Sequence, residues 1–110
     1  MRYEIRPWGF FAIVHRERKL GWQIKKVVVN PESRISLQRH SHRSEYWIIM
    51  EGEARITKGE LVYEAKVGHS VDIPVGEIHR LENIGDGLLV VVEVQTGERI
   101  EDSYGRTDYI

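Results

Sequence analysis

Cysteine is absent from this sequence of 110 residues, so the chain can form no disulfide and offers no thiolate as a metal ligand or nucleophile. A reducing compartment suits such a chain. No apolar run approaches the length of a membrane-spanning helix, and residues 2–6 carry charges where a signal peptide would have its apolar core. We therefore expect a cytoplasmic protein with no membrane partner.

An excess of charge of either sign is also absent. Sixteen basic residues face seventeen acidic ones, which gives a net charge of −1, and the two signs are mixed along the chain. A nucleic-acid-binding domain needs a basic patch or stripe, and this pattern does not offer one. We expect no nucleic acid partner.

No stretch shows a sustained helical period with capping residues. Short runs rich in Val, Ile and aromatic residues alternate instead with turns that contain Gly or Pro, which predicts an all-β sandwich or barrel. The predicted strands are residues 10–15, 22–30, 35–40, 46–50, 54–57, 61–64, 70–73, 78–82 and 88–95. The length predicts a single domain over residues 1–110. From about residue 97 the sequence turns polar, and we expect an irregular C-terminal tail anchored by Tyr104 and Tyr109.

Residues that can bind a divalent metal ion gather in two stretches. Gln38 and His40 are two residues apart, so on a strand both side chains leave the same face and can share a ligand. Glu45 adds a carboxylate, and His79, which follows the turn at residues 74–76, can supply a second imidazole. Two imidazoles, a carboxylate and an amide oxygen predict a site for one divalent ion: Zn, Mn, Fe, Co or Ni. Two alternatives stay open: Gln38 could hydrogen-bond a ligand from behind, and Glu45 could merely begin a strand.

The second stretch resembles a conserved motif of the cupin superfamily at every motif position. These positions are Gly68, Pro74, Gly76, His79 and Asn83. Proline fixes φ and glycine permits a tight bend, so the turn before His79 can bring the chain back with this imidazole facing inward. The resemblance implies a small double-stranded β-helix, which is a jelly-roll-type barrel.

The first stretch resembles the other cupin motif, with two departures. Gln38 stands where the family usually has a His, and Glu32 stands where it usually has a Gly. A pair formed by His40 and His42 is an alternative, but Glu45 would then follow too soon for the motif. The register that begins at Gln38 is preferred, and it implies Gln38, His40, Glu45 and His79 as the metal ligands.

A narrower resemblance extends over nearly the whole chain. The matching segments, in chain order, are Arg6-Pro7-Trp8-Gly9, Ser36-Leu37-Gln38-Arg39-His40, Arg43-Ser44-Glu45-Tyr46-Trp47, Ile73-Pro74, His79-Arg80-Leu81-Glu82-Asn83, Val92-Glu93-Val94-Gln95-Thr96-Gly97 and Tyr104-Gly105-Arg106. They resemble the type II mannose-6-phosphate isomerase domain, and this implies interconversion of mannose 6-phosphate and fructose 6-phosphate. That domain usually follows a mannose-1-phosphate guanylyltransferase in bifunctional enzymes. Because the first segment begins almost at Met1, we expect no fused nucleotidyltransferase domain here.

A sugar-phosphate substrate would need fixed positive charge close to the metal. Arg43, between two ligands in the sequence, is the first candidate, and a surface ion pair is its alternative. Arg80 is a second candidate, although strand alternation would point it away from His79 and toward a pairing with Glu82. Lys26 is a third, and strand alternation alone does not decide whether Lys26 or Lys25 faces inward.

Isomerisation through an enediol also needs a base that moves a proton between C1 and C2. Glu93 and His42 are the inward candidates, since Glu93 shares its face with Gln95 and His42 shares the alternation of Gln38 and His40. Glu93 could equally support a ligand from behind.

Two other functions remain open. A non-catalytic cupin module that binds or senses sugars is the main alternative to the isomerase, because the segment between residues 97 and 104 is shorter than the family's. Another metal-cupin chemistry, such as dioxygenation, is a third. The apolar runs 27–29 and 90–92 exceed what a small barrel buries, so we also expect a homodimer.

Overall fold

A computed structural model describes residues 2–98 and residue 100. All nine regular elements among these residues are β-strands, so the prediction of an all-β protein is confirmed. They are β1 (Arg2–Arg6), β2 (Gly9–Glu17), β3 (Trp22–Val29), β4 (Arg43–Glu51), β5 (Glu53–Lys58), β6 (Leu61–Lys66), β7 (Ser70–Ile73), β8 (His79–Asn83) and β9 (Leu89–Gly97). Within the described part of the chain, no helix is long and apolar enough to cross a membrane.

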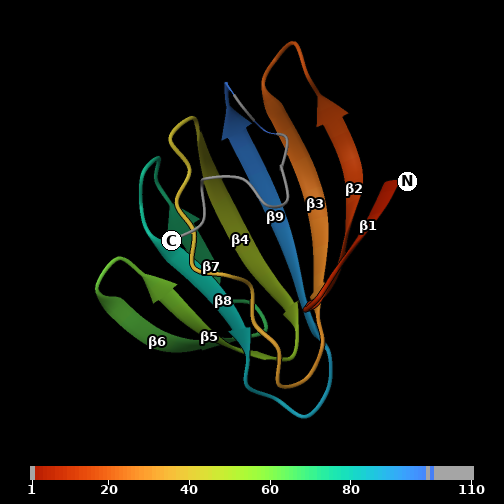
Figure 1. Cartoon of the computed structure of the whole chain (residues 1–110), viewed down its shortest axis with the longest axis vertical. Helices are drawn as coiled ribbons and strands as arrows, with labels where there is room; N and C mark the ends of the chain where they lie inside the picture. Colours follow the sequence, from red (N-terminus) through yellow and green to blue (C-terminus); the bar gives the residue numbers. More distant parts are fainter. Residues whose placement is uncertain (1, 99, 101–110) are drawn as a thin grey trace.

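The strands form two sheets that enclose the interior (Figure 1). The larger sheet has six strands in the order β1-β2-β3-β9-β4-β7, and the smaller has three in the order β6-β5-β8. The last strand, β9, lies between β3 and β4 and pairs antiparallel with both. Side chains from the beginning, middle and end of the chain therefore meet on one inner face.

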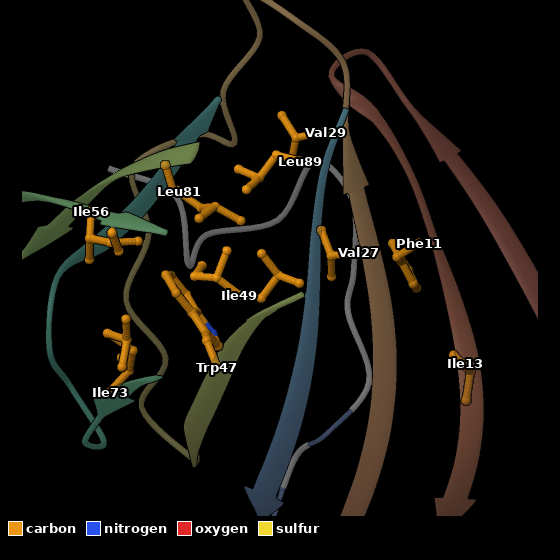
Figure 2. Close-up of a cluster of buried hydrophobic side chains, with 14 residues drawn as sticks. Phe11, Ile13, Val27, Val29, Trp47, Ile49, Ile56, Ile73, Leu81 and Leu89 are labelled. Carbon is orange, nitrogen blue, oxygen red and sulfur yellow. The ribbon is translucent and has the colours of Figure 1, made fainter. Parts of the chain in front are cut away.

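A cluster of fourteen buried apolar residues fills the space between the sheets. Figure 2 shows Trp47 and Ile49 of β4 pointing toward Leu81 of β8, while Phe11 and Val27 enter from β2 and β3. Trp47, Ile49 and Leu81 are at most 1% exposed. Burial of this apolar surface is the main term that holds the two sheets together.

Two strand predictions need correction. β1 was not predicted, and it pairs with β2 along the edge of the larger sheet. Residues 35–40 were predicted as a strand, but they make only one isolated bridge to β8, at Gln38 with His79, and a second bridge lies just before them, at Arg34 with Glu82. The pairing shifts by one residue between the two bridges, so no regular ladder forms.

Glu32 explains how the chain enters this irregular segment. It has a φ of 60°, the left-handed conformation that glycine adopts without strain. Glycine is usual at this position of the cupin motif, and Glu32 adopts here a conformation that is typical of glycine.

The prediction of an irregular C-terminal tail can be compared with the structure only near its start. β9 ends at Gly97, where the irregular tail was expected to begin. Tyr104 and Tyr109, the predicted anchors, lie outside the described residues.

The register of β3, β9 and β4 arranges the inward side chains in rows. The rows are Gln23–Gln95–Glu45, then Lys25–Glu93–Trp47, then Val27–Val91–Ile49, and all nine residues are buried. One end of the interior is therefore polar and the other apolar.

Candidate metal centre and substrate cavity

Three predicted metal ligands lie together at the polar end. One ligand atom from each of His40, Glu45 and His79 can be chosen so that all three lie within 4.8 Å of one another, and all three residues are buried. Glu45 Oε2 is 3.3 Å from His40 Nε2, and Glu45 Oε1 is 4.0 Å from His79 Nε2. The two stretches singled out in the sequence thus converge on one site.

Backbone hydrogen bonds bring these stretches together. Gln38 and His79 exchange two of them, of 3.0 and 2.8 Å. The Gly76 amide donates to the His40 carbonyl at 2.8 Å, from a turn in which Gly76 has a φ of 82°. The turn before His79 therefore also fixes the segment that carries His40, which gives the spacing of this motif a structural reason.

Both imidazoles present Nε2 toward Glu45. His79 Nδ1 lies 2.9 Å from the Glu77 carbonyl oxygen, which can only accept, so Nδ1 carries a proton. Arg43 Nη2 lies 3.0 Å from His40 Nε2, and a guanidinium can only donate, so His40 Nε2 accepts. In the neutral form of each ring, Nε2 is then the nitrogen whose lone pair can ligate a metal, and at His40 the metal would take the place of the Arg43 donor. With the Glu45 carboxylate, this donor set fits a first-row divalent ion.

Glu45 is held by three side chains. Arg43 donates to its Oε2 from Nε at 3.0 Å and forms an ion pair from Nη2 at 2.9 Å. Trp47 Nε1 donates to Oε1 at 2.9 Å, and Gln95 Nε2 donates to Oε2 at 3.0 Å. The carboxylate is thus oriented before any metal arrives.

The charge state of Glu45 follows from these contacts. Burial alone would raise the pKa of its carboxyl, but the Arg43 guanidinium opposes this, with smaller contributions from His79, His40 and the Trp47 N–H. Together they hold the pKa of Glu45 below its ordinary value. Glu45 is therefore ionised at neutral pH and can ligate a metal.

A chain of amides runs behind the site. Gln95 Nε2 donates to both Glu45 Oε2 and Glu93 Oε2 at 3.0 Å. Because both carboxylates accept, Gln95 Oε1 faces the other way and accepts from Gln23 Nε2 at 2.6 Å. Gln23 Oε1 in turn accepts from Arg16 Nε at 2.6 Å. The roles of Gln23 and Arg16 were not predicted; the inward alternation that Gln23 shares with Lys25 was the available signal.

A cavity of about 410 Å³ opens at this site. Seven of the nine predicted site residues line it: Gln38, His40, Arg43, Glu45, His79, Arg80 and Glu93. Gln38 is half-buried, and its amide nitrogen lies 3.3 Å from Ser36 Oγ, so its oxygen remains available for a ligand.

His42 and Lys26 lie outside the cavity, and both are exposed. The alternation assumed for His42 breaks because the chain bends at residues 41–42 and β4 begins inward at Arg43. His42 Nδ1 lies 3.6 Å from Glu98 Oε2 instead. On β3 the inward lysine is Lys25, which is 2% exposed, and this decides the choice left open by the sequence.

Two predicted phosphate ligands also differ from expectation. Arg43 was expected to contact phosphate or to form a surface ion pair, but it is 5% exposed and lies against the predicted metal ligands. Its Nη2 contacts ligand atoms of both His40 and Glu45, so a metal ion there would compete with these contacts. The expected partner of Arg80, Glu82, lies 3.7 Å from Arg34.

Comparison with known proteins bears on both the family and the fold. The family model described as mannose-6-phosphate isomerase C-terminal matches residues 2–108. The xanthan biosynthesis protein XanB of Xanthomonas campestris pv. campestris is 40% identical over 110 residues, which covers 93% of this chain and 23% of that protein. The alginate biosynthesis protein AlgA of Pseudomonas aeruginosa is 39% identical over 110 residues, with 93% and 22% covered. The chain thus spans less than a quarter of the length of these relatives.

Among solved structures, the cupin domain of Cnp3 from Schizosaccharomyces pombe is similar, with a TM-score of 0.76. Its sequence identity is 16%, and the match covers 80% of this chain and 64% of that one. At that identity the likeness concerns the fold, and it confirms the predicted cupin barrel. Together with the family match, it shows that this chain belongs to the mannose-6-phosphate isomerase C-terminal family and has a cupin fold.

Proposed function

We propose that this chain is a metal-dependent sugar-phosphate isomerase that interconverts mannose 6-phosphate and fructose 6-phosphate. The observation that carries the proposal is the buried cluster of His40, Glu45 and His79 in a cavity that also holds Glu93. A metal site and a buried carboxylate within one cavity are the two parts that an aldose–ketose isomerisation requires.

His40, Glu45 and His79 would hold the ion, and Gln38 would add its amide oxygen. A bound divalent ion supplies Lewis-acid polarisation of the sugar carbonyl. The chain contributes the orientation of its ligands: Glu77 fixes the His79 ring, and Arg43 fixes the Glu45 carboxylate.

Glu93 is the base that this geometry favours over His42. It is 5% exposed, lines the cavity, and its Oε2 is held by Gln95 at 3.0 Å. Placed there, its carboxylate takes a proton from one of C1 and C2 and returns it to the other. His42 is exposed outside the cavity and has no access to these carbons.

The decisive experiment is a coupled assay of fructose 6-phosphate formation from mannose 6-phosphate. Purified protein is treated with a chelator and then supplied with Zn, Mn, Fe, Co or Ni singly. We expect one or more of these metals to restore turnover, His79→Ala to abolish it, and His69→Ala to leave it unchanged, because His69 is an exposed histidine outside the cavity. Failure with every metal, while sugar phosphates still protect the protein against thermal unfolding, would favour the non-catalytic module.

The homodimer, the cytoplasmic location and the single domain are proposed on the sequence alone. Val28, one of the residues used to predict the dimer, is already buried within the chain, whereas Tyr3 and Ile5 of the edge strand β1 are exposed. Exposed apolar side chains on an edge strand favour pairing with a second copy. Light scattering at micromolar concentration tests the dimer, and a monodisperse monomer would contradict it.

A further inference from the structure

Cationic side chains outnumber carboxylates in the lining of the cavity, although the chain is nearly neutral. Five cationic side chains line it, against two carboxylates: Arg6, Lys25, Arg34, Arg43 and Arg80, against Glu45 and Glu93. Some of these cations have carboxylate partners: Arg43 pairs with Glu45, Arg34 lies 3.7 Å from Glu82, and Arg6 lies 3.8 Å from Glu4. A partly enclosed site lined mainly by cationic groups favours the entry of an anion.

Arg43 is poorly placed to receive the phosphate of a hexose 6-phosphate. Its guanidinium is hydrogen-bonded to His40 and Glu45, at the place where the reacting carbons must lie. The phosphate is attached to C6, at the opposite end of the carbon chain from C1 and C2. The cations that bind it must therefore lie away from the metal ligands.

Arg6 and Lys25 meet this condition, and both lie against the ring of Phe11. Lys25 Nζ lies 3.9 Å from the centroid of the Phe11 ring, and Arg6 Cζ lies 5.2 Å from the same centroid. Both side chains line the cavity and are shielded from water: Lys25 is 2% exposed and the Arg6 side chain 15%. Two cationic groups that lie against one ring and line the same cavity can both contact an anion bound there.

The strand order of the larger sheet sets the distance between Lys25 and the predicted metal ligand Glu45. Lys25 is on β3 and Glu45 on β4, with β9 between them. Two strand spacings of about 4.8 Å separate their backbones by about 10 Å across the sheet. This separation is comparable with the length of a six-carbon chain that ends in a phosphate.

Arg80, on β8 of the opposite sheet, lines the same cavity. Its Nε is buried without a hydrogen-bond partner among the described residues. An unsatisfied buried donor destabilises a protein, and a phosphate oxygen is a strong acceptor for a guanidinium.

We propose that Arg6, Lys25 and Arg80 form a phosphate subsite, distinct from the metal centre, that receives the terminal phosphate of the substrate. The proposal rests on the proposed function for its choice of substrate, but phosphate binding can be measured without turnover. We therefore expect the cavity to bind mannose 6-phosphate in preference to mannose.

Calorimetric titration with inorganic phosphate, in chelator and again with metal, tests the subsite. Arg6→Gln and Lys25→Met are expected to weaken phosphate binding about tenfold or more, because each loses a charge-assisted contact. Arg39→Gln, which removes the same charge from an exposed arginine outside the cavity, is expected to leave binding unchanged. Lys25→Arg keeps the charge and should retain much of the affinity. Unfolding curves establish that each variant is folded, and metal affinity should stay the same in all of them.

The outcomes separate this proposal from the isomerase. Wild-type protein that does not bind phosphate, or folded Arg6→Gln and Lys25→Met variants that bind it normally, would overturn the subsite. Phosphate binding that is lost in Arg43→Met but kept in Lys25→Met would also overturn it, since the anion would then lie at the metal end. If no metal gives turnover but the wild type binds phosphate and Lys25→Met does not, the isomerase proposal is contradicted and the subsite proposal is supported.

Discussion

The two ends of the barrel interior lie on the same strands, but one end forms the apolar core and the other holds the candidate site. At the apolar end, the row Val27–Val91–Ile49 packs against Leu81 and fills the core. At the polar end, the row Gln23–Gln95–Glu45 has every side chain hydrogen-bonded and none in the apolar cluster. Alternation along the strands is identical at both ends, so it determines which residues face inward but not what they do there.

The apolar end contributes most to stability, and the polar end carries the groups that can do chemistry. Apolar burial needs only shape and volume, and it tolerates similar residues. A buried carboxylate, by contrast, needs a complete set of donors around it, because each missing partner is costly. The polar end can therefore be altered with little change in fold only where its hydrogen-bond partners are kept.

The largest effect on stability is expected at the apolar end. Ile49→Ala removes a side chain that is fully buried and should lower the free energy of unfolding by about 4 kcal/mol, because it leaves a cavity. Met50→Ala, on the same strand but exposed, should change it by about 0.5 kcal/mol or less. Urea unfolding measures both. Metal affinity should survive Ile49→Ala, and its loss there would show that the two ends are not independent.

Arg43→Met is expected to have the next largest effect. This substitution leaves the Glu45 carboxylate buried without the Arg43 guanidinium. It should lower the free energy of unfolding, measured in chelator, by about 3 kcal/mol. Added metal should restore more stability to this variant than to the wild type, because the ion supplies the missing positive charge without competition from Arg43. Thermal unfolding with and without metal measures this difference. Equal metal-induced shifts in both proteins would mean that Arg43 and the ion do not share the site.

The polar end should also make stability depend on pH. The pKa of Glu45 is lowered in the folded protein, so the unfolded chain takes up this proton first as the pH falls. The stability that Glu45 contributes is complete above its ordinary pKa of 4.5 and is lost as the pH falls through the lower, folded value. Urea unfolding in chelator from neutral pH to well below pH 4.5 should show this loss, with a shallower dependence in Glu45→Gln. Identical dependence in the two proteins would contradict the assignment.

The smallest effect lies outside both ends, at the entrance to the irregular segment. Glu32 is exposed and adopts a φ of 60°, which strains any residue with a Cβ. Glu32→Gly should raise the free energy of unfolding by about 0.5 kcal/mol, as relief of strain outweighs the added freedom of the unfolded chain. Ser33→Gly, next to it, should not stabilise the protein. Destabilisation by Glu32→Gly would show that the glutamate side chain makes a contribution of its own.

Much of the fold and the core of the site could be read from the sequence. Short apolar runs between turns indicated the strands, and motif spacing brought His40, Glu45 and His79 together correctly. The irregular segment at residues 35–40 was mistaken for a strand, since a one-residue shift in pairing leaves no trace in the pattern of residue types. Strand β1 was missed because a short charged stretch with exposed side chains carries little strand signal.

The sequence by itself indicated the residue types of the candidate metal site and which residues within most of the strands share a face, since both depend on local spacing. Only the tertiary structure decided that Lys25 faces the cavity, that Arg43 holds Glu45, and that Gln23 and Gln95 link Arg16 to two carboxylates. These contacts join strands that are far apart in the chain, and they depend on the register in which β3, β9 and β4 pair. Register is settled by the packing of the whole barrel, so no local pattern contains it.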